Sequence, residues 1–216
     1  MSSWSVSTIE TETNFDCPFG ICVASLSPVL TFFGDMCGVC RIAGTVSSDG
    51  GTQLLRIDRI VGGAGIWIVA QLAFSADRNA LFAVDNSHHG VRRLNLTTMK
   101  VDTVAGTPMS DGHRDGAAKQ AQFNDPWGIV LDADGSLLIS DRDNHCLRRL
   151  SADLALVETV AGVPGQKGSQ DGAAKQATFN WPRGLAADVN GDVLIADFSN
   201  KLVRRLHDGE IGRAHV

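Results

Sequence analysis

A segment of this chain is repeated almost unchanged at a spacing of 56 residues. DGAAKQAQFNDPWGIVLDADGSLLISDRDNHCLRRL, which opens at Asp115, aligns without a gap with DGAAKQATFNWPRGLAADVNGDVLIADFSNKLVRRL, which opens at Asp171. The same spacing places the end of an earlier copy at Leu94, and a degenerate copy covers residues 15–42. Such a period predicts an array of equivalent units, because each unit is one supersecondary element that neighbouring copies must cover.

Each unit contains four short segments rich in Val, Ile and Leu, separated by Asp, Asn and Gly, and we expect four β-strands. In the copy at Asp115 they are GIVLDAD, SLLISD, CLRRLSA and LVETVAG. Asp134-Gly135 and Asn190-Gly191 predict tight two-residue hairpins. DGAAKQA predicts a small-residue turn or a short helix that leads to the next sheet. Ala70-Gln71-Leu72 stands where later copies have Pro-x-Gly, so an irregular first strand is expected there.

The fold class follows from the lack of charges on both faces of the expected sheet. One four-stranded sheet cannot cover both of its own faces, and stacking against neighbours does so. With 23 glycines, no Tyr and 44% hydrophobic residues, the chain favours an all-β fold. We therefore expect a partial β-propeller of about three to four antiparallel four-stranded blades over residues 15–209. Residues 1–14 receive no assignment.

The last residues differ in origin from the repeats. IGRAHV, the final six residues, is the translation of one frame of a common sequencing adapter and matches nothing in the repeats. We expect residues 210–216 to be an artefact, so that the biological sequence continues beyond them.

The two complete copies resemble NHL repeats. PWGIVLDADGSLLISDRDNHCLRRL and PRGLAADVNGDVLIADFSNKLVRRL carry the pattern Pro-x-Gly-apolar, an Asp, a Gly, a strand ending in an Asp, an Asn, and apolar-Arg-basic-apolar. With the weaker copies the resemblance spans Phe15 to Leu206. It implies a propeller that is most commonly six-bladed, used mostly to bind proteins or RNA and in a few branches as a lyase or lactonase-like enzyme. Four copies would leave the ring to be completed by missing blades of the same chain.

Charge and hydropathy argue against two classes of partner. Nineteen basic and 24 acidic residues leave a net charge of −5, so the chain lacks the positive field that gathers nucleic acid. The longest apolar run, residues 21–33, contains Pro28 and falls short of the roughly 20 residues that span a bilayer. Five cysteines, an odd number, are more consistent with a reducing compartment such as the cytoplasm than with a disulfide framework.

Three aspartates recur at the ends of the second strands: Asp85, Asp141 and Asp197. We expect each to accept hydrogen bonds within the following turn, because Asn144 and Asn200 stand where an amide can complete that turn. The alternative is a ring of carboxylates around Ca²⁺ or Mg²⁺, which Phe33 interrupts in the first copy.

Three arginine pairs stand on the third strands, where alternation points one member to each face of the sheet. We expect the second members to face the next blade as hydrogen-bond or ion-pair donors: Arg93, Arg149 and Arg205. Arg41 occupies this position in the first copy. The alternative, a rim that reads RNA, is disfavoured by net acidity and by the lack of nearby Tyr or Phe stacking partners.

No residue pattern nominates a catalytic residue, a metal site or a cofactor. A nucleophile elbow, a P-loop, a dinucleotide fingerprint and H-E-x-x-H are all missing from the sequence. His89 and His145 occupy equivalent turn positions, and we expect surface residues there, with a shared metal as the alternative. Zinc is the alternative for a cysteine group that we expect to be spread over one blade: Cys17, Cys22, Cys37 and Cys40.

A non-catalytic scaffold that binds a protein partner is the function that these patterns favour. The residues predicted to form its contact surface are Trp127, Trp181, Arg183 and Phe198. Aromatic and arginine side chains are enriched in binding hot spots, but Trp127 follows its proline whereas Trp181 precedes its own, so packing under a loop is an equal alternative. The competing functions are a propeller hydrolase or lyase with a central metal, and an RNA-binding domain.

Overall fold

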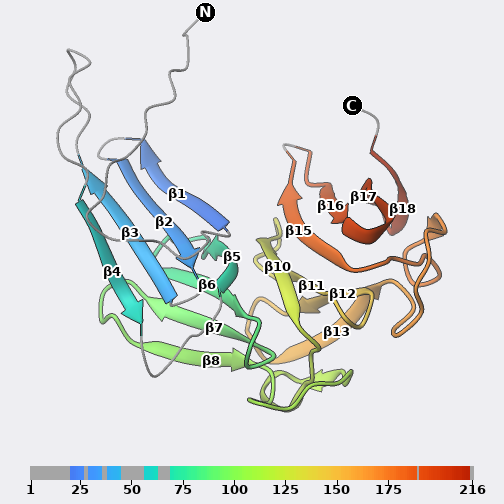
Figure 1. Cartoon of the computed structure of the whole chain (residues 1–216), viewed down its shortest axis with the longest axis horizontal. Coiled ribbons are helices and arrows are strands. Elements are labelled where there is room, and N and C mark those ends of the chain that lie inside the picture. Colours follow the sequence, from blue (N-terminus) through green and yellow to red (C-terminus); the bar gives the residue numbers. More distant parts are fainter. Residues whose placement is uncertain are drawn as a thin grey trace, which may run out of the picture.

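The structure is a computed structural model that describes residues 20–26, 29–35, 38–44, 56–62, 69–188 and 190–214, with side chains for 70–188 and 190–214. Its strands form four antiparallel sheets that lie side by side in an open arc (Figure 1). In chain order the first two sheets, blades 1 and 2, contain β1 (Gly20–Leu26), β2 (Val29–Asp35), β3 (Gly38–Gly44) and β4 (Arg56–Gly62), then β5 (Val69–Phe74), β6 (Ala80–Asp85), β7 (Gly90–Asn95) and β8 (Val101–Ala105).

Blades 3 and 4 each have a further short edge strand. Blade 3 contains β10 (Pro126–Leu131), β11 (Leu137–Asp141), β12 (Cys146–Leu150) and β13 (Leu156–Ala161), with β9 (Gly116–Ala117) at its outer edge. Blade 4 contains β15 (Pro182–Ala187), β16 (Val193–Asp197), β17 (Leu202–His207) and β18 (Glu210–Arg213), with β14 (Gly172–Ala173) at its outer edge. The predicted all-β fold of four-stranded antiparallel blades is confirmed. Within the described ranges no helix is both long and apolar enough to cross a membrane.

The DGAAKQA segments join each blade to the one that precedes it in the chain. In blade 3 the segment forms β9, which pairs with β13, and then the short 3-10 helix η1 (Ala118–Gln120). In blade 4 it forms β14, which pairs with β18. The connection is thus a small strand as well as the expected turn. That residues 210–216 derive from an adapter concerns the origin of the sequence and stays a prediction, although Glu210–Arg213 pair as β18.

The hairpins between first and second strands are longer than the predicted two-residue turns. The Asp132 N–H donates to the Ser136 carbonyl at 2.8 Å, so residues 133–135 form the loop, and Gly135 has a φ of +84°. Asp188 and Asp192 make the same contact at 2.8 Å around Gly191. The glycine takes the left-handed conformation at the end of the loop, which suits a longer hairpin as well as a two-residue one.

Each sheet of the middle of the arc buries both of its faces against neighbouring sheets. All five residues of β11 are buried. Leu137 and Ile139 belong to an apolar cluster shared with blade 2, whereas Leu138 belongs to a cluster shared with blade 4. This alternation of buried faces is the mutual covering that the repeat predicts.

The innermost strands β5, β10 and β15 approach one another closely. Ser140 Oγ accepts the Gly128 N–H at 2.7 Å and donates to the Arg183 carbonyl at 2.5 Å, which ties β10 to β15. Gln71 Nε2 donates to the Leu185 carbonyl at 2.7 Å, and the Leu185 N–H donates to Gln71 Oε1 at 3.1 Å. The side chain that replaces Pro-x-Gly in blade 2 therefore links β5 to β15.

The irregularity expected only for the first strand of blade 2 is shared by three blades. The pairing register of β5 with β6 shifts between Val69 and Leu72. Equivalent shifts occur at the starts of β10 and β15. The bulge therefore belongs to the repeat and does not depend on the Pro-x-Gly residues.

Replacing Gly128 by alanine is expected to lower the free energy of unfolding by about 1–3 kcal/mol through overpacking. A β-carbon there would collide with the Arg183 carbonyl oxygen and lie 2.8 Å from Ser140 Oγ. Gly184 holds the equivalent position in blade 4, and among the described residues no atom lies within 4 Å of a β-carbon built there. Urea denaturation of both variants measures the difference; equal losses for G128A and G184A would contradict it.

Candidate functional site

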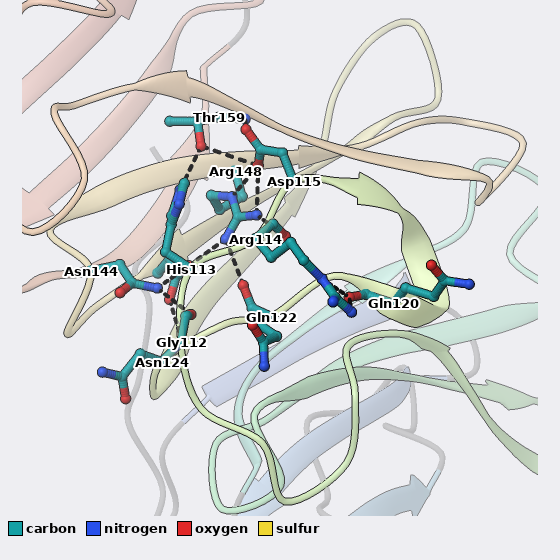
Figure 2. Close-up of polar contacts among 11 residues, drawn as sticks. Gly112, His113, Arg114, Asp115, Gln120, Gln122, Asn124, Asn144, Arg148 and Thr159 are labelled. Atoms are coloured by element: carbon teal, nitrogen blue, oxygen red, sulfur yellow. Dashed lines mark hydrogen bonds and ion pairs between the residues drawn. The ribbon is translucent and has the colours of Figure 1, made fainter.

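A buried arginine organises the residues beneath the rim of each complete blade. Arg148, on β12, is fully buried, and all five of its N–H donors find acceptors (Figure 2). Its Nη1 donates to Asp141 Oδ2 at 2.7 Å and to the Gln122 carbonyl at 2.9 Å. Its Nε and Nη2 donate to Asp115 Oδ1 at 3.0 and 2.6 Å, and Nη2 also reaches the Arg114 carbonyl at 2.9 Å. One side chain thereby fixes the whole connecting segment onto its blade.

Blade 4 repeats this arrangement around Arg204. Its guanidinium contacts Asp197 at 3.0 Å and Asp171 at 2.5 Å, and it donates to the carbonyls of Thr178 and Gln170 at 3.2 and 2.9 Å. In both blades the guanidinium also lies over a buried phenylalanine ring of the connecting segment, at 5.0 Å in blade 3 and 5.3 Å in blade 4. The repeat therefore encodes a buried ion-pair network as well as strands.

The first arginine of each pair is the buried one, which differs from our expectation for the second. The second arginines form ion pairs with aspartates of their own blades, at 3.3, 3.4 and 3.3 Å: Arg93 with Asp102, Arg149 with Asp132, and Arg205 with Asp192. Register explains the difference, because the pairing of β12 with β13 shifts between Leu147 and Arg148, and that of β7 with β8 shifts at the equivalent place. Alternation alone does not say which face meets the connecting segment.

The recurring aspartates are held within their blades. Asp141 Oδ1 accepts the Asn124 N–H at 2.7 Å, and Oδ2 accepts Asn144 Nδ2 at 2.8 Å in addition to Arg148. Asp197 has equivalent partners in Asn180, Asn200 and Arg204, and Asp85 accepts from Arg92 at 2.9 Å. Asn144 and Asn200 are the turn amides that the sequence predicts. Burial raises the pKa of Asp141 to about 6, although Arg148 and the hydrogen bonds act in the opposite direction.

Among the residues with described side chains, no group of three His, Cys, Asp or Glu side chains is placed to hold a metal ion. The carboxylates of Asp85, Asp141 and Asp197 point into their own networks. The cysteine group predicted with a zinc alternative, Cys17 to Cys40, lies outside the described side chains.

Replacing Arg148 by methionine is expected to lower the free energy of unfolding by about 3–5 kcal/mol, because it leaves Asp141 buried without its cation. The adjacent Arg149→Met is the matched control: that side chain is 34% exposed and its contact with Asp132 is 3.4 Å, so a change of about 0.5 kcal/mol is expected. Chemical denaturation at pH 7 compares the two. A larger loss for Arg149→Met would reverse the assignment of the two arginines.

Two histidines connect consecutive blades through the backbone. His145 Nδ1 accepts the Trp181 N–H at 3.2 Å, and His89 Nδ1 accepts the Asp125 N–H at 3.1 Å. His145 is only 3% exposed, so the expectation of a surface residue is wrong at this position. An N–H can only donate, which requires Nδ1 to be unprotonated and the imidazole to be neutral. The histidines therefore act as acceptors between blades.

The contact at His145 is expected to weaken in acid. Burial, followed by the charge of Lys167, lowers the pKa of His145 below its ordinary value of 6.5. The unfolded chain takes up this proton near pH 6.5 whereas the folded chain does not, so the stabilisation is complete above that pH and falls as pH decreases toward the folded pKa. Asp141 acts in the opposite sense, since its raised pKa gives stability that is lost as pH rises through about 6.

His145→Asn isolates the histidine. Asparagine tolerates the left-handed backbone at this position, where φ is +57°, and offers an oxygen acceptor that does not titrate. The free energy of unfolding of wild type relative to H145N is expected to fall between pH 7.5 and pH 5, roughly the range around the histidine pKa. The Asp141 effect is common to both proteins and cancels. Parallel curves for the two proteins would refute the coupling.

An alternating stack of aromatic and cationic side chains crosses the rim of blades 3 and 4. We call it the aromatic ladder; its members are, in order, Phe198, Arg183, Trp127, Arg142, Trp181 and Lys167. The Arg183 guanidinium carbon lies 3.6 Å from the centre of the Phe198 ring and 4.6 Å from that of Trp127. The Arg142 guanidinium carbon lies 5.1 Å from the centre of Trp127 and 5.3 Å from that of Trp181. The four predicted contact residues therefore lie together.

Strand pairing explains why these residues meet at one end of the blades. Pro126 at the start of β10 pairs with Asp141 at the end of β11, and Pro182 pairs with Asp197 in blade 4. The starts of the innermost strands and the turns after the second strands thus share one rim. Lys167, from the β13–β14 connection, completes the ladder with its Nζ 5.8 Å from the centre of Trp181. Each such stacked contact stabilises by about 0.5–1 kcal/mol at exposed sites.

Two repeat positions supply four members of the ladder with their chemistry exchanged. Trp127 in blade 3 is equivalent to Arg183 in blade 4, and Arg142 is equivalent to Phe198. Blade 2 has amides at the same two positions: Gln71 and Asn86. Sequence reasoning missed Arg142, although a comparison of these two positions between copies shows that aromatic and cation change places.

Antiparallel four-stranded blades that cover one another around the innermost strands define a β-propeller architecture. The family profile of the NHL repeat matches residues 123–150 and 179–206, the segments that contain both buried-arginine networks. The chain belongs to the NHL repeat family.

Proteins from distant organisms share parts of this sequence and fold. The chain is 29% identical over 140 residues to Protein SUPPRESSOR OF QUENCHING 1, chloroplastic, of Arabidopsis thaliana, covering 62% of this chain and 13% of that protein. It is 31% identical over 99 residues to NHL repeat-containing protein 2 of Gallus gallus, covering 44% of this chain and 13% of that protein. An auxiliary nutrient binding protein from Bacteroides ovatus has the same fold, with a TM-score of 0.67 and 21% identity over 92% of this chain and 48% of that one. The chain thus spans about an eighth of these relatives.

Proposed function

We propose that the chain is a protein-interaction module and that the aromatic ladder is its binding surface. The observation that carries the proposal is the exposure of large rings on a fixed framework: Trp181 is 36% exposed and Phe198 is 50% exposed. Both rings stack against guanidinium groups whose positions are set by the blades beneath. Aromatic and arginine side chains dominate binding hot spots, and groups held in place before binding lose little entropy on association.

The framework under the ladder supports this role. Trp181 has a φ of +56°, which is rare for a bulky side chain, and its N–H is held by His145 Nδ1. Asp125 holds the equivalent position in blade 3 with a φ of +54° and is held by His89 in the same way. The backbone on both sides of the seam is therefore fixed in an uncommon conformation that presents a ring to solvent in one blade and a carboxylate in the other.

A selection from a phage-displayed random peptide library tests the proposal. Peptides enriched on the wild-type chain are expected to bind W181A and F198A at least about tenfold more weakly, as expected for hot-spot residues. The matched controls are Met109→Ala and Leu156→Ala, which remove exposed apolar side chains, 74% and 49% exposed, outside the ladder. Enriched peptides that bind W181A and F198A as tightly as wild type would refute the ladder as the binding surface.

RNA binding, the competing function, is distinguished with a single-stranded RNA probe in the same assay. The net charge of −5 and the pairing of Arg142 with Asp125 and Asp143 support a protein ligand instead. Affinity for the RNA that exceeds peptide affinity and falls steeply with salt would overturn the proposal.

A further inference from the structure

Arg183 differs in its surroundings from the other cations of the ladder. Its guanidinium lies between the rings of Phe198 and Trp127, at 3.6 and 4.6 Å from their centres. Rings that cover the flat faces of a guanidinium leave its edge for hydrogen bonds in the plane. Arg183 is therefore oriented by stacking, with its donors directed along the edge between two blades.

The charge of Arg183 has no described counterion. Arg142 pairs with Asp125 and contacts Asp143 at 3.1 Å, whereas Arg183 forms no ion pair with any residue of the described ranges. Four arginines have a buried Nε without a hydrogen-bond partner: Arg93, Arg149, Arg183 and Arg204. The other three each hold a carboxylate at a terminal nitrogen.

Leaving this guanidinium without a carboxylate is costly for the folded chain. Partial burial and the nearby charge of Arg142 lower the pKa of Arg183 from its ordinary value. A carboxylate from a ligand would relieve both effects, because it returns hydrogen bonds to the buried donors and offsets the repulsion. A planar, preoriented arginine favours a planar, bidentate acceptor.

Resting on the proposed function of the ladder, we propose that Arg183 binds the carboxylate of an Asp or Glu in an acidic peptide, while Phe198 and Trp181 contact an apolar residue beside it. The surroundings select against a polyanion. Asp125 and Asp143 lie along the ladder next to Arg142, so a continuous phosphate backbone would meet two carboxylates beside the one unpaired guanidinium. One carboxylate between apolar groups matches the chemistry of the ladder.

Two synthetic peptide arrays provide the probe. The first consists of decapeptides with a single Glu flanked by Trp or Leu, and the second replaces that Glu by Gln. The wild-type chain is expected to bind its best Glu peptides at least about tenfold more tightly than the Gln counterparts, since a charge-assisted bidentate contact is lost. R183Q is expected to lose this discrimination, and R183K, which keeps the charge without the planar fork, to retain only part of it.

Controls separate this proposal from the function on which it rests. R149Q, a change at another partly exposed arginine, should discriminate like wild type, and urea midpoints confirm that the variants fold. Equal binding of Glu and Gln peptides, or discrimination that survives R183Q, overturns the carboxylate site and leaves the ladder as a binding surface. Failure of both arrays on the wild-type chain overturns both proposals, and preferential binding of a single-stranded RNA of similar length assigns Arg183 to phosphate instead.

Discussion

The ion pair between a buried arginine and the aspartate that ends the preceding strand is the interaction on which the blades depend. A guanidinium removed from water destabilises a fold unless its donors are satisfied, and Arg148 satisfies all of them with two carboxylates and two carbonyls. Three of these acceptors belong to the connecting segment, which strand pairing holds only through β9. The network thus converts a flexible connection into a fixed base for the next blade.

This fixed base permits variation at the rim above it. Asp141 and Asp197 sit in almost the same surroundings, yet the residues that follow them, Arg142 and Phe198, differ completely in chemistry. The positions after Pro126 and Pro182 vary in the same manner. Stability resides in the buried repeat, and the capacity for recognition resides in the few positions that differ between copies.

The sequence predicted the strands, the blade order and the propeller because these follow from local pattern and from the period of the repeat. It did not predict which arginine is buried, since that depends on a register shift beside Arg148 and on carbonyls of a separate segment. The four contact residues were found individually from residue type. Their stacking was not, because Trp127 and Trp181 are not equivalent in the repeat and meet only through Arg142 at a seam.

The exchange of Trp127 for Arg183 and of Arg142 for Phe198 determines which blade can stand beside which. Two identical copies of blade 3 would place like groups at each of the two shared positions and could not build the same sequence of stacked pairs. Adjacent blades here are complementary in the way that two strands of a coded duplex are. Departures from the consensus at these positions thus specify the order of neighbours, and a chain made uniform by consensus design would lose this specification along with the ladder.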